Sequence, residues 1–255
     1  MHSRPLFYLG LLCSLSLLGG CASTPAPTKS VEDYFKEGEA AYASRNYEEA
    51  IVQWKKVKES FPAPELTAQA DLKIADAHFE DEAFIEAAAA YDDFRKLHPG
   101  HEKVPYAMYR LALSHYFQIE GIDTDQTPVA NAVLTLEAFL NQYPESEHAA
   151  EARQKLGDCR AKQLEYENYV GNFYLRTGKY QAAIKRLNEA LVRFPNMPKL
   201  DETLFYLGQA YLKSGNVQQG RVVLQRLARE YPASPRNKGA AKLMGGFAGY
   251  SSQGE

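Results

Sequence analysis

The stretch GQAYLKSGNVQQGRVVLQRLAREYP, residues 208–232, has the pattern of two helices joined by a tight turn. Small residues at Gly208 and Gly220 let the two helices approach closely, and Gly215 falls in the turn between them. Proline lacks a backbone N–H and cannot continue a helix, so Pro232 marks the end of the second helix. The stretch therefore predicts one complete antiparallel helix pair.

The same frame occurs five times, and each copy closes with an aromatic residue or a histidine followed by proline. The doublets are Phe61-Pro62, His98-Pro99, Tyr143-Pro144, Phe194-Pro195 and Tyr231-Pro232. A helix pair repeated in this register, with small residues where the helices touch, resembles the tetratricopeptide repeat. We therefore expect an all-α fold, an α-solenoid of five tetratricopeptide-like helix pairs. A generic helical bundle with accidental prolines is the alternative.

The intervals between successive prolines are 37, 45, 51 and 37 residues, so the third and fourth units are enlarged. In the third unit about eight additional residues lie between the helices, around Ile119 to Thr127. In the fourth unit the helical pattern continues from about Glu147 to Arg176, a length of about 45 Å at the rise of an α-helix. We expect this long helix to hold the two halves of the solenoid together as one rigid piece.

Three patterns predict helix starts. Ser30 with Asp33 has the spacing of a capping box. Thr127-Pro128 and Ser234-Pro235 each match an N-cap residue followed by a proline in the first helical position.

The first 20 residues have the features of a signal peptide. Leu6 to Leu18 is an apolar run too short to span a bilayer, and it leads into Leu18-Gly19-Gly20-Cys21, which resembles a bacterial lipobox. We expect residues 1–20 to be removed, Cys21 to carry N-acyl and S-diacylglycerol lipid, and residues 21–30 to form a flexible tether. Ala22, rather than Asp, then implies outer-membrane retention. An ordinary signal peptide with an incidental cysteine is the alternative.

Composition argues against other function classes. The formal net charge of −3 comes without the basic stripe that nucleic-acid binding needs. Once Cys13 leaves with the signal and Cys21 is acylated, Cys159 stands alone, which excludes a disulfide within the mature chain. We expect Cys159 to pack in the core.

No catalytic or metal-binding constellation is recognisable in the sequence. It has no glycine-rich phosphate loop, nucleophile elbow or histidine pair at zinc-helix spacing. His98 and His101 flank a turn, which we interpret as a solvated connection between units rather than a metal site. Asp123 and Asp125 lack the glycine and distal glutamate of a calcium loop, so we expect an exposed loop with a capping role. We therefore predict a protein that is not an enzyme and has no metal or cofactor beyond its lipid; an unrecognised enzyme is the weakest alternative.

The first helix of each pair lines the concave face in such solenoids. In the first three units this face is expected to present an aromatic groove made of Phe35, Tyr42, Leu72, Phe79, Tyr106, Tyr109, Tyr116 and Phe117. In the last two units it is expected to be polar, with Asn168, Asn172, Arg176, Gln209 and Lys213. Glu39 on the inner face disfavours binding of a C-terminal carboxylate, so the groove suits an extended peptide with apolar or aromatic side chains. Burial of these aromatic residues in the core is the alternative.

Three segments resemble one family. They are the insert GIDTDQTP at 121–128, the long helix after Pro144, and YENYVGNFY at 166–174 leading to KYQAAIKRL at 179–187. They look like the BamD family, the lipoprotein subunits of the β-barrel assembly machinery. The resemblance covers roughly Val31 to Pro232 and is most specific in the insert and the fourth repeat.

The resemblance implies a lipid-anchored protein of the outer membrane that faces the periplasm. Its repeats over 31–144 would receive unfolded outer-membrane proteins, whose C-terminal signal ends in an aromatic residue. Its repeats over 145–232 would bind the last periplasmic POTRA domain of the barrel subunit BamA, alongside other subunits of the complex. Arg186 matches the arginine that pairs with an acidic residue of BamA in this family, and Arg176 is expected to contribute to the same surface.

Residues 233–255 are predicted to be a C-terminal cap followed by a disordered tail after Leu243, because Gly, Ser and Gln dominate there. The sequence thus favours a non-enzymatic adaptor for assembling β-barrel proteins. A tetratricopeptide scaffold lipoprotein of another envelope system, such as a pilotin or a coordinator of cell-wall synthesis, stays open as the alternative.

Overall fold

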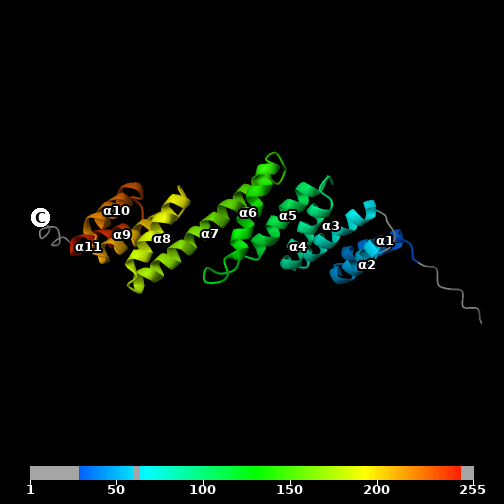
Figure 1. The fold of residues 1–255 in the computed structure, drawn as a ribbon, viewed down its shortest axis with the longest axis horizontal. Coiled ribbons are helices and arrows are strands. Elements are labelled where there is room, and N and C mark those ends of the chain that lie inside the picture. The colour runs from blue at the N-terminus through cyan, green and yellow to red at the C-terminus, as the bar shows by residue number, and fades with distance from the viewer. Residues whose placement is uncertain (1–28, 60–63, 248–255) are drawn as a thin grey trace, which may run out of the picture.

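The computed structural model describes residues 29–59 and 64–247. Across these ranges the chain forms eleven α-helices and no strand: α1 Val31–Ala43, α2 Tyr47–Glu59, α3 Pro64–Glu80, α4 Phe84–Leu97, α5 Val104–Phe117, α6 Thr127–Gln142, α7 Ala149–Arg176, α8 Tyr180–Arg193, α9 Leu200–Lys213, α10 Val217–Glu230 and α11 Asn237–Gly246. Figure 1 shows an elongated array that runs from α1 at one end to α11 at the other. The predicted all-α solenoid of five helix pairs is confirmed.

The helices of each pair approach closely at the small residues of the repeat frame. A Cβ atom built on Gly208 of α9 would lie 2.5 Å from Leu224 Cδ2 of α10, well inside van der Waals contact. A Cβ on Gly38 of α1 would lie 2.4 Å from Trp54 Nε1 of α2. Glycine is therefore required at both positions because a larger side chain has no space.

The aromatic–proline doublets close the helix pairs as predicted. His98, Tyr143, Phe194 and Tyr231 each follow the last residue of a second helix and donate a backbone N–H to the carbonyl four residues earlier. Their backbones then leave helical geometry, which a following proline favours. The remaining doublet, 61–62, lies outside the described residues.

The two irregular units join the halves of the array. The connection between α5 and α6 covers residues 118–126, and α7 is 28 residues long, about 42 Å at the helical rise. Ala152 and Cys159 of α7 belong to the core shared with α3 to α6, whereas Leu164 and Leu175 pack with α8 and α9. One helix therefore belongs to both cores, and Cys159 is fully buried as expected.

The helix starts agree with the predictions in one case of three. Ser30 and Asp33 form the capping box. At α6 the cap comes from the Asp125 carboxylate, which accepts from both the backbone N–H and the hydroxyl of Thr127, so the prediction of Thr127 as the N-cap is wrong. Asp125 thereby has the capping role expected for its loop.

The C-terminal segment differs from its prediction in two respects. α11 begins at Asn237, because Ser234 lies in the preceding turn and its hydroxyl is 2.5 Å from Asp201 Oδ2 of α9. Disorder after Leu243 is wrong for the next three residues, since α11 continues to Gly246. Residues 248–255 lie outside the described part, as do the predicted signal peptide, Cys21 and residues 21–28 of the tether.

Candidate functional site

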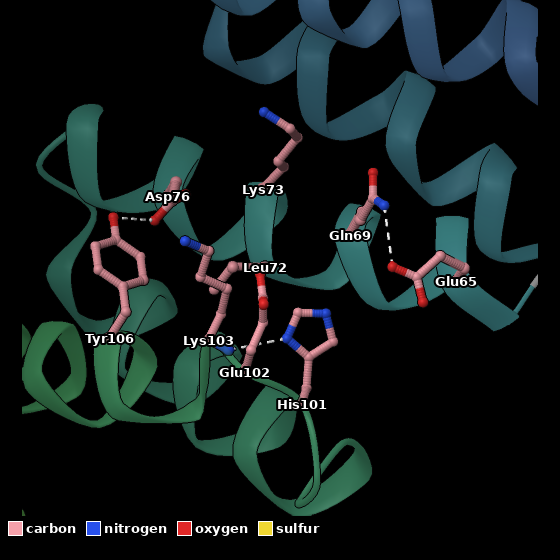
Figure 2. A pocket seen from close by; sticks show the side chains of 9 residues that line it. All are labelled: Glu65, Gln69, Leu72, Lys73, Asp76, His101, Glu102, Lys103 and Tyr106. Atoms are coloured by element: carbon pink, nitrogen blue, oxygen red, sulfur yellow. Dashed lines mark hydrogen bonds between the residues drawn. The ribbon is translucent and has the colours of Figure 1, made fainter. Parts of the chain in front are cut away.

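An open pocket of about 630 Å³ lies on the first three units, between α3 and the start of α5 (Figure 2). It is lined by Glu65, Gln69, Leu72, Lys73 and Asp76 of α3, by His101, Glu102 and Lys103 of the turn before α5, and by Tyr106 of α5. The turn closes one side because the chain must reverse after α4, which brings polar loop residues against α3.

A partly buried carboxylate, that of Asp76, lies at the back of this pocket. Asp76 Oδ1 accepts hydrogen bonds from the hydroxyls of Tyr106 (2.9 Å) and Tyr91 (2.6 Å), and Figure 2 shows Tyr106 pointing at it. Burial raises the pKa of the Asp76 carboxyl above its usual range, although the two tyrosine hydroxyls act in the opposite direction. The three side chains link α3, α4 and α5 and leave part of a polar group facing the pocket.

The rim of the pocket carries both signs of charge. Lys73 forms an ion pair with Glu39 of α1 at 2.7 Å, so the inner-face glutamate expected from the sequence is already partnered. Lys103 is exposed, and Glu65 and Glu102 stand on the same rim. This arrangement suits the alternating donors and acceptors of an extended peptide backbone better than a single anionic group.

An aromatic cluster lies at the other end of α3 and α5. Phe117 stacks on Phe84 with ring centroids 5.2 Å apart, and Phe79 meets both rings edge-on. Tyr116 packs beside Phe117 and lies under the Lys155 ammonium of α7, 4.3 Å from the ring centroid. Phe117 is 47% exposed, so the cluster presents an aromatic face to solvent.

Of the predicted groove residues on the second and third units, Phe79, Tyr106, Tyr116 and Phe117 border the pocket or the aromatic cluster, whereas Tyr109 borders neither. Its side chain is only 4% exposed and stacks on His148, with centroids 4.3 Å apart and rings nearly parallel. The prediction of Tyr109 as a groove residue is wrong. It lies three residues after Tyr106, which rotates it by about 300° around α5 and turns it towards the start of α7.

The aromatic residues of the first unit mainly build that unit's core. Tyr42 packs against Tyr47 and Trp54, with ring centroids 5.4 and 5.8 Å away. Phe35 is half-buried in the same cluster, and its backbone carbonyl accepts from Trp54 Nε1. Both predicted groove residues are therefore structural in large part, and among the described residues of this half the most exposed aromatic side chain is Phe117.

Of the polar residues expected on the inner face of the last two units, Asn168 is buried, whereas Arg176 and Lys213 are exposed. Asn168 is 2% exposed and forms a buried hydrogen bond in which Thr203 Oγ1 donates to its Oδ1 at 2.7 Å. Tyr169 and Phe173 of the same helix are instead exposed, and Tyr169 lines a small pocket of about 260 Å³ together with Ile122 of the insert. Sequence reasoning missed this pair, although its spacing of four residues places both side chains on one side of α7.

The two arginines expected to contact a partner differ in their surroundings. Arg186 of α8 is partly buried, with Nε 2.6 Å from Glu167 Oε2 of α7 but without an aligned hydrogen bond at that nitrogen. Its guanidinium also lies 5.5 Å from the Tyr166 ring centroid. Arg176, the last residue of α7, is exposed.

The described residues offer neither a cluster of metal ligands nor a helix that could span a membrane. Nowhere in 29–59 or 64–247 do three or more His, Cys, Asp or Glu side chains gather as a metal ion would require. Among the helices in these ranges, none has the length and apolar character needed to cross a bilayer. The Nε2 atom of His98, in the turn after α4, lies 2.8 Å from the Asp71 carboxylate of α3.

Comparison with known families matches residues 27–227 to the model described as YfiO, outer membrane lipoprotein. The chain belongs to this family. The match extends from before α1 into α10 and includes the 118–126 connection and α7, the two features that carry the resemblance found in the sequence.

Relatives of this YfiO-family chain carry the name outer membrane protein assembly factor BamD. The protein from Caulobacter vibrioides is 28% identical over 220 residues, covering 84% of this chain and 72% of the relative. The protein from Vibrio cholerae is 27% identical over 216 residues, covering 80% and 90%. Among solved structures, the TPR2AB domain of yeast Sti1 is 14% identical, with a TM-score of 0.42 and coverage of 86% of each chain.

Proposed function

We propose that this YfiO-family chain is an outer membrane protein assembly factor that works as a non-catalytic adaptor. The family match over residues 27–227 carries the proposal, because it includes both irregular features that distinguish this array from a regular repeat protein. The relatives named as assembly factors support the same role, and they do not favour a pilotin or a cell-wall coordinator.

The first three units, α1 to α6, receive the unfolded client. Two features support this assignment: the pocket beside Asp76 and the aromatic cluster around Phe117 lie on the same pair of helices, α3 and α5. An aromatic side chain near the client's C-terminus would pack on Phe117 and Phe84, and the mixed-charge rim would bind the extended backbone.

The later units, α7 to α10, bind the last periplasmic POTRA domain of BamA through Arg186 and Arg176. Glu167 holds the Arg186 guanidinium in place, so an acidic partner residue would complete a three-charge contact. A pre-positioned side chain loses less conformational entropy on binding than a free one.

A lipid on Cys21 anchors the protein at the outer membrane, facing the periplasm. The motif Leu18-Gly19-Gly20-Cys21 supports this proposal, and two or more acyl chains are sufficient for stable anchoring. Mass spectrometry of the mature N-terminus tests it, and an unmodified Cys21 would contradict it.

Peptide binding tests the client site. We expect Phe117→Ser to weaken binding of an aromatic-ended barrel peptide by about tenfold, the loss typical of an interface anchor. Tyr169→Ser is the matched control, because Tyr169 is equally exposed on the other half. Fluorescence anisotropy measures both affinities. Equal losses, or none, would remove the client site from α3 and α5.

A charge swap tests the partner site. Arg186→Glu should reduce recovery of BamA from detergent-solubilised outer membrane. The double variant Arg186→Glu, Glu167→Arg restores an ion pair between α7 and α8 but leaves a negative charge at position 186. Continued loss of BamA in the double variant supports a direct contact. Full recovery would mean that Arg186 only holds α8 against α7.

A further inference from the structure

Basic side chains gather at the C-terminal end of the solenoid. Between Leu200 and Phe247, which include α9, α10 and α11, the chain has seven basic and three acidic residues, a net charge of +4. Between Lys29 and Lys199 it has 21 basic and 28 acidic residues, a net charge of −7. Figure 1 places α9 to α11 together at one tip, so the molecule has a cationic end on an acidic body.

The acidic residues of this tip are already engaged. Asp201 and Glu202, at the start of α9, both contact Arg236, at 3.5 and 2.7 Å. The third acid, Glu230, is shared by two arginines of α10. All three acidic side chains of the tip are therefore paired with arginines of the tip, and the remaining basic side chains have no acidic partner there.

Three lysines account for most of that excess. Lys213 ends α9, and Lys238 and Lys242 lie one turn apart on the same side of α11. All three are exposed, and no ion pair to any of them occurs within the described ranges. Their charges are therefore available to an external anionic surface.

We propose that the lysines of this tip, Lys213 at the end of α9 with Lys238 and Lys242 of α11, contact an anionic phospholipid surface. Lysines clustered on a helix are attracted to anionic lipid headgroups without fixed geometry. A protein partner would be expected to meet arginine and aromatic anchors, because lysine is depleted from protein interfaces. On α11 the exposed residues other than the two lysines are small, namely Ala241, Gly245 and Gly246, whereas Tyr231 is half-buried against the core of the tip.

The charge separation also determines orientation. An anionic membrane repels the body with its net −7 and attracts only the tip. With a lipid on Cys21 near α1, the tip would form a second attachment at the opposite end, and the solenoid would lie along the bilayer. The cellular setting rests on the proposed anchoring, but the tip's affinity for lipid does not.

Vesicle binding tests the proposal on the mature chain from residue 21 with Cys21→Ser, which removes the acyl anchor. We expect cosedimentation with vesicles of phosphatidylethanolamine and phosphatidylglycerol, weakening as salt is added. Vesicles in which phosphatidylcholine replaces phosphatidylglycerol should bind little. The triple variant Lys213→Gln, Lys238→Gln, Lys242→Gln should lower the partition coefficient by about tenfold or more.

A second triple variant, Lys36→Gln, Lys179→Gln, Lys185→Gln, is the matched control because it removes three exposed lysines from the acidic body. It should bind vesicles as the parent does. Equal loss in both triples, equal binding to neutral vesicles, or retained binding in the tip variant would overturn the proposal. If the tip variant instead loses BamA while keeping its lipid affinity, an acidic protein face is the occupant. Peptide binding through Phe117 is unaffected by either outcome and tests the client role separately.

Discussion

Two regions of the molecule join successive first helices through polar side chains, with different consequences. On α3 and α5, Asp76 accepts from Tyr106 beside a pocket of about 630 Å³. On α7 and α9, Asn168 accepts from Thr203, and both residues are almost fully buried. The first contact leaves a polar group next to an open surface, whereas the second is sealed within the packing.

This difference distinguishes a binding surface from a structural joint. A buried hydrogen bond between neutral groups stabilises one arrangement of two helices, because each group would be costly to leave unpaired. A buried carboxylate near a pocket is less favourable for stability, since burial penalises its charged form. Stability should therefore depend most on the α7–α10 region, and ligand binding on the α3–α5 region.

The largest loss of stability is expected where α9 and α10 approach each other most closely, at Gly208. Gly208→Val would place side-chain atoms inside Leu224 and should destabilise the protein by about 3 kcal/mol, the upper range for overpacking. Urea denaturation measures the change. Gly157→Ala in α7 is the control, because a Cβ there meets nothing within 4 Å and should stabilise the helix by about 0.5–1 kcal/mol. Similar losses in both variants would contradict the close-packing argument.

The next largest loss of stability is expected from removing the buried hydrogen bond between Asn168 and Thr203. Asn168→Ala leaves the Thr203 hydroxyl buried without its acceptor and should cost about 2 kcal/mol of unfolding free energy. Adding Thr203→Val removes the orphaned hydroxyl and should recover part of that loss. If the double variant is as unstable as the sum of the single changes, the hydrogen bond is not what joins α7 to α9.

The pH dependence of the unfolding free energy tests the contact between Asp76 and Tyr106 beside the open pocket. Since burial raises the pKa of Asp76 in the folded state, the folded protein holds the proton over a range where the unfolded chain releases it. Stability contributed by this group is therefore present at low pH and declines as pH rises above the ordinary aspartate value. Asp76→Asn should lack that decline, so the variant gains on the parent as pH increases. Parallel urea-denaturation profiles would contradict the burial argument.

Asp92 serves as a control because its pKa shift has the opposite sign to that of Asp76. The pKa of the Asp92 carboxyl is lowered overall. Burial alone would raise this pKa, but hydrogen bonds and charges from Lys96 and Arg95 outweigh the effect of burial. Stability from Asp92 is therefore present above the ordinary aspartate pKa and is lost as pH falls through the lowered value. Asp92→Asn should flatten the profile on its acid side.

The smallest effect concerns the hydroxyl of Tyr106. Tyr106→Phe keeps the ring and removes one donor to Asp76, which retains Tyr91 as a partner. We expect a stability loss of about 1 kcal/mol or less and a further rise in the pKa of Asp76, measured by NMR titration of its carboxyl carbon. An unchanged pKa would mean that Tyr106 does not stabilise the ionised carboxylate.

Much of the fold could be predicted because its signals are local. Proline after an aromatic residue ends a helix wherever it occurs, and Gly208 or Gly38 allows close approach whatever the sequence elsewhere. The continuous helical pattern after Pro144 likewise predicted α7 to within two residues of its start. The site was harder to predict, because whether an aromatic side chain faces a groove or a core depends on which helix packs beside it.

Tyr109 and Asn168 show the limit of the sequence. Both lie on first helices in positions that the repeat frame assigns to the concave face, and both are buried, since α7 covers Tyr109 and α9 covers Asn168. Similarly, Asp76 carries no sequence signal that separates it from other helix acids. Only the approach of Tyr91 and Tyr106 from two other helices makes it distinctive.

The sequence by itself determined the number of helix pairs, where each one ends, the insert and the long helix, because each depends on residues close together in the chain. The tertiary structure decided which aromatic residues stay exposed and how the carboxylate of Asp76 is held. These depend on contacts between helices distant in sequence, whose free energies arise only when burial removes water from both partners.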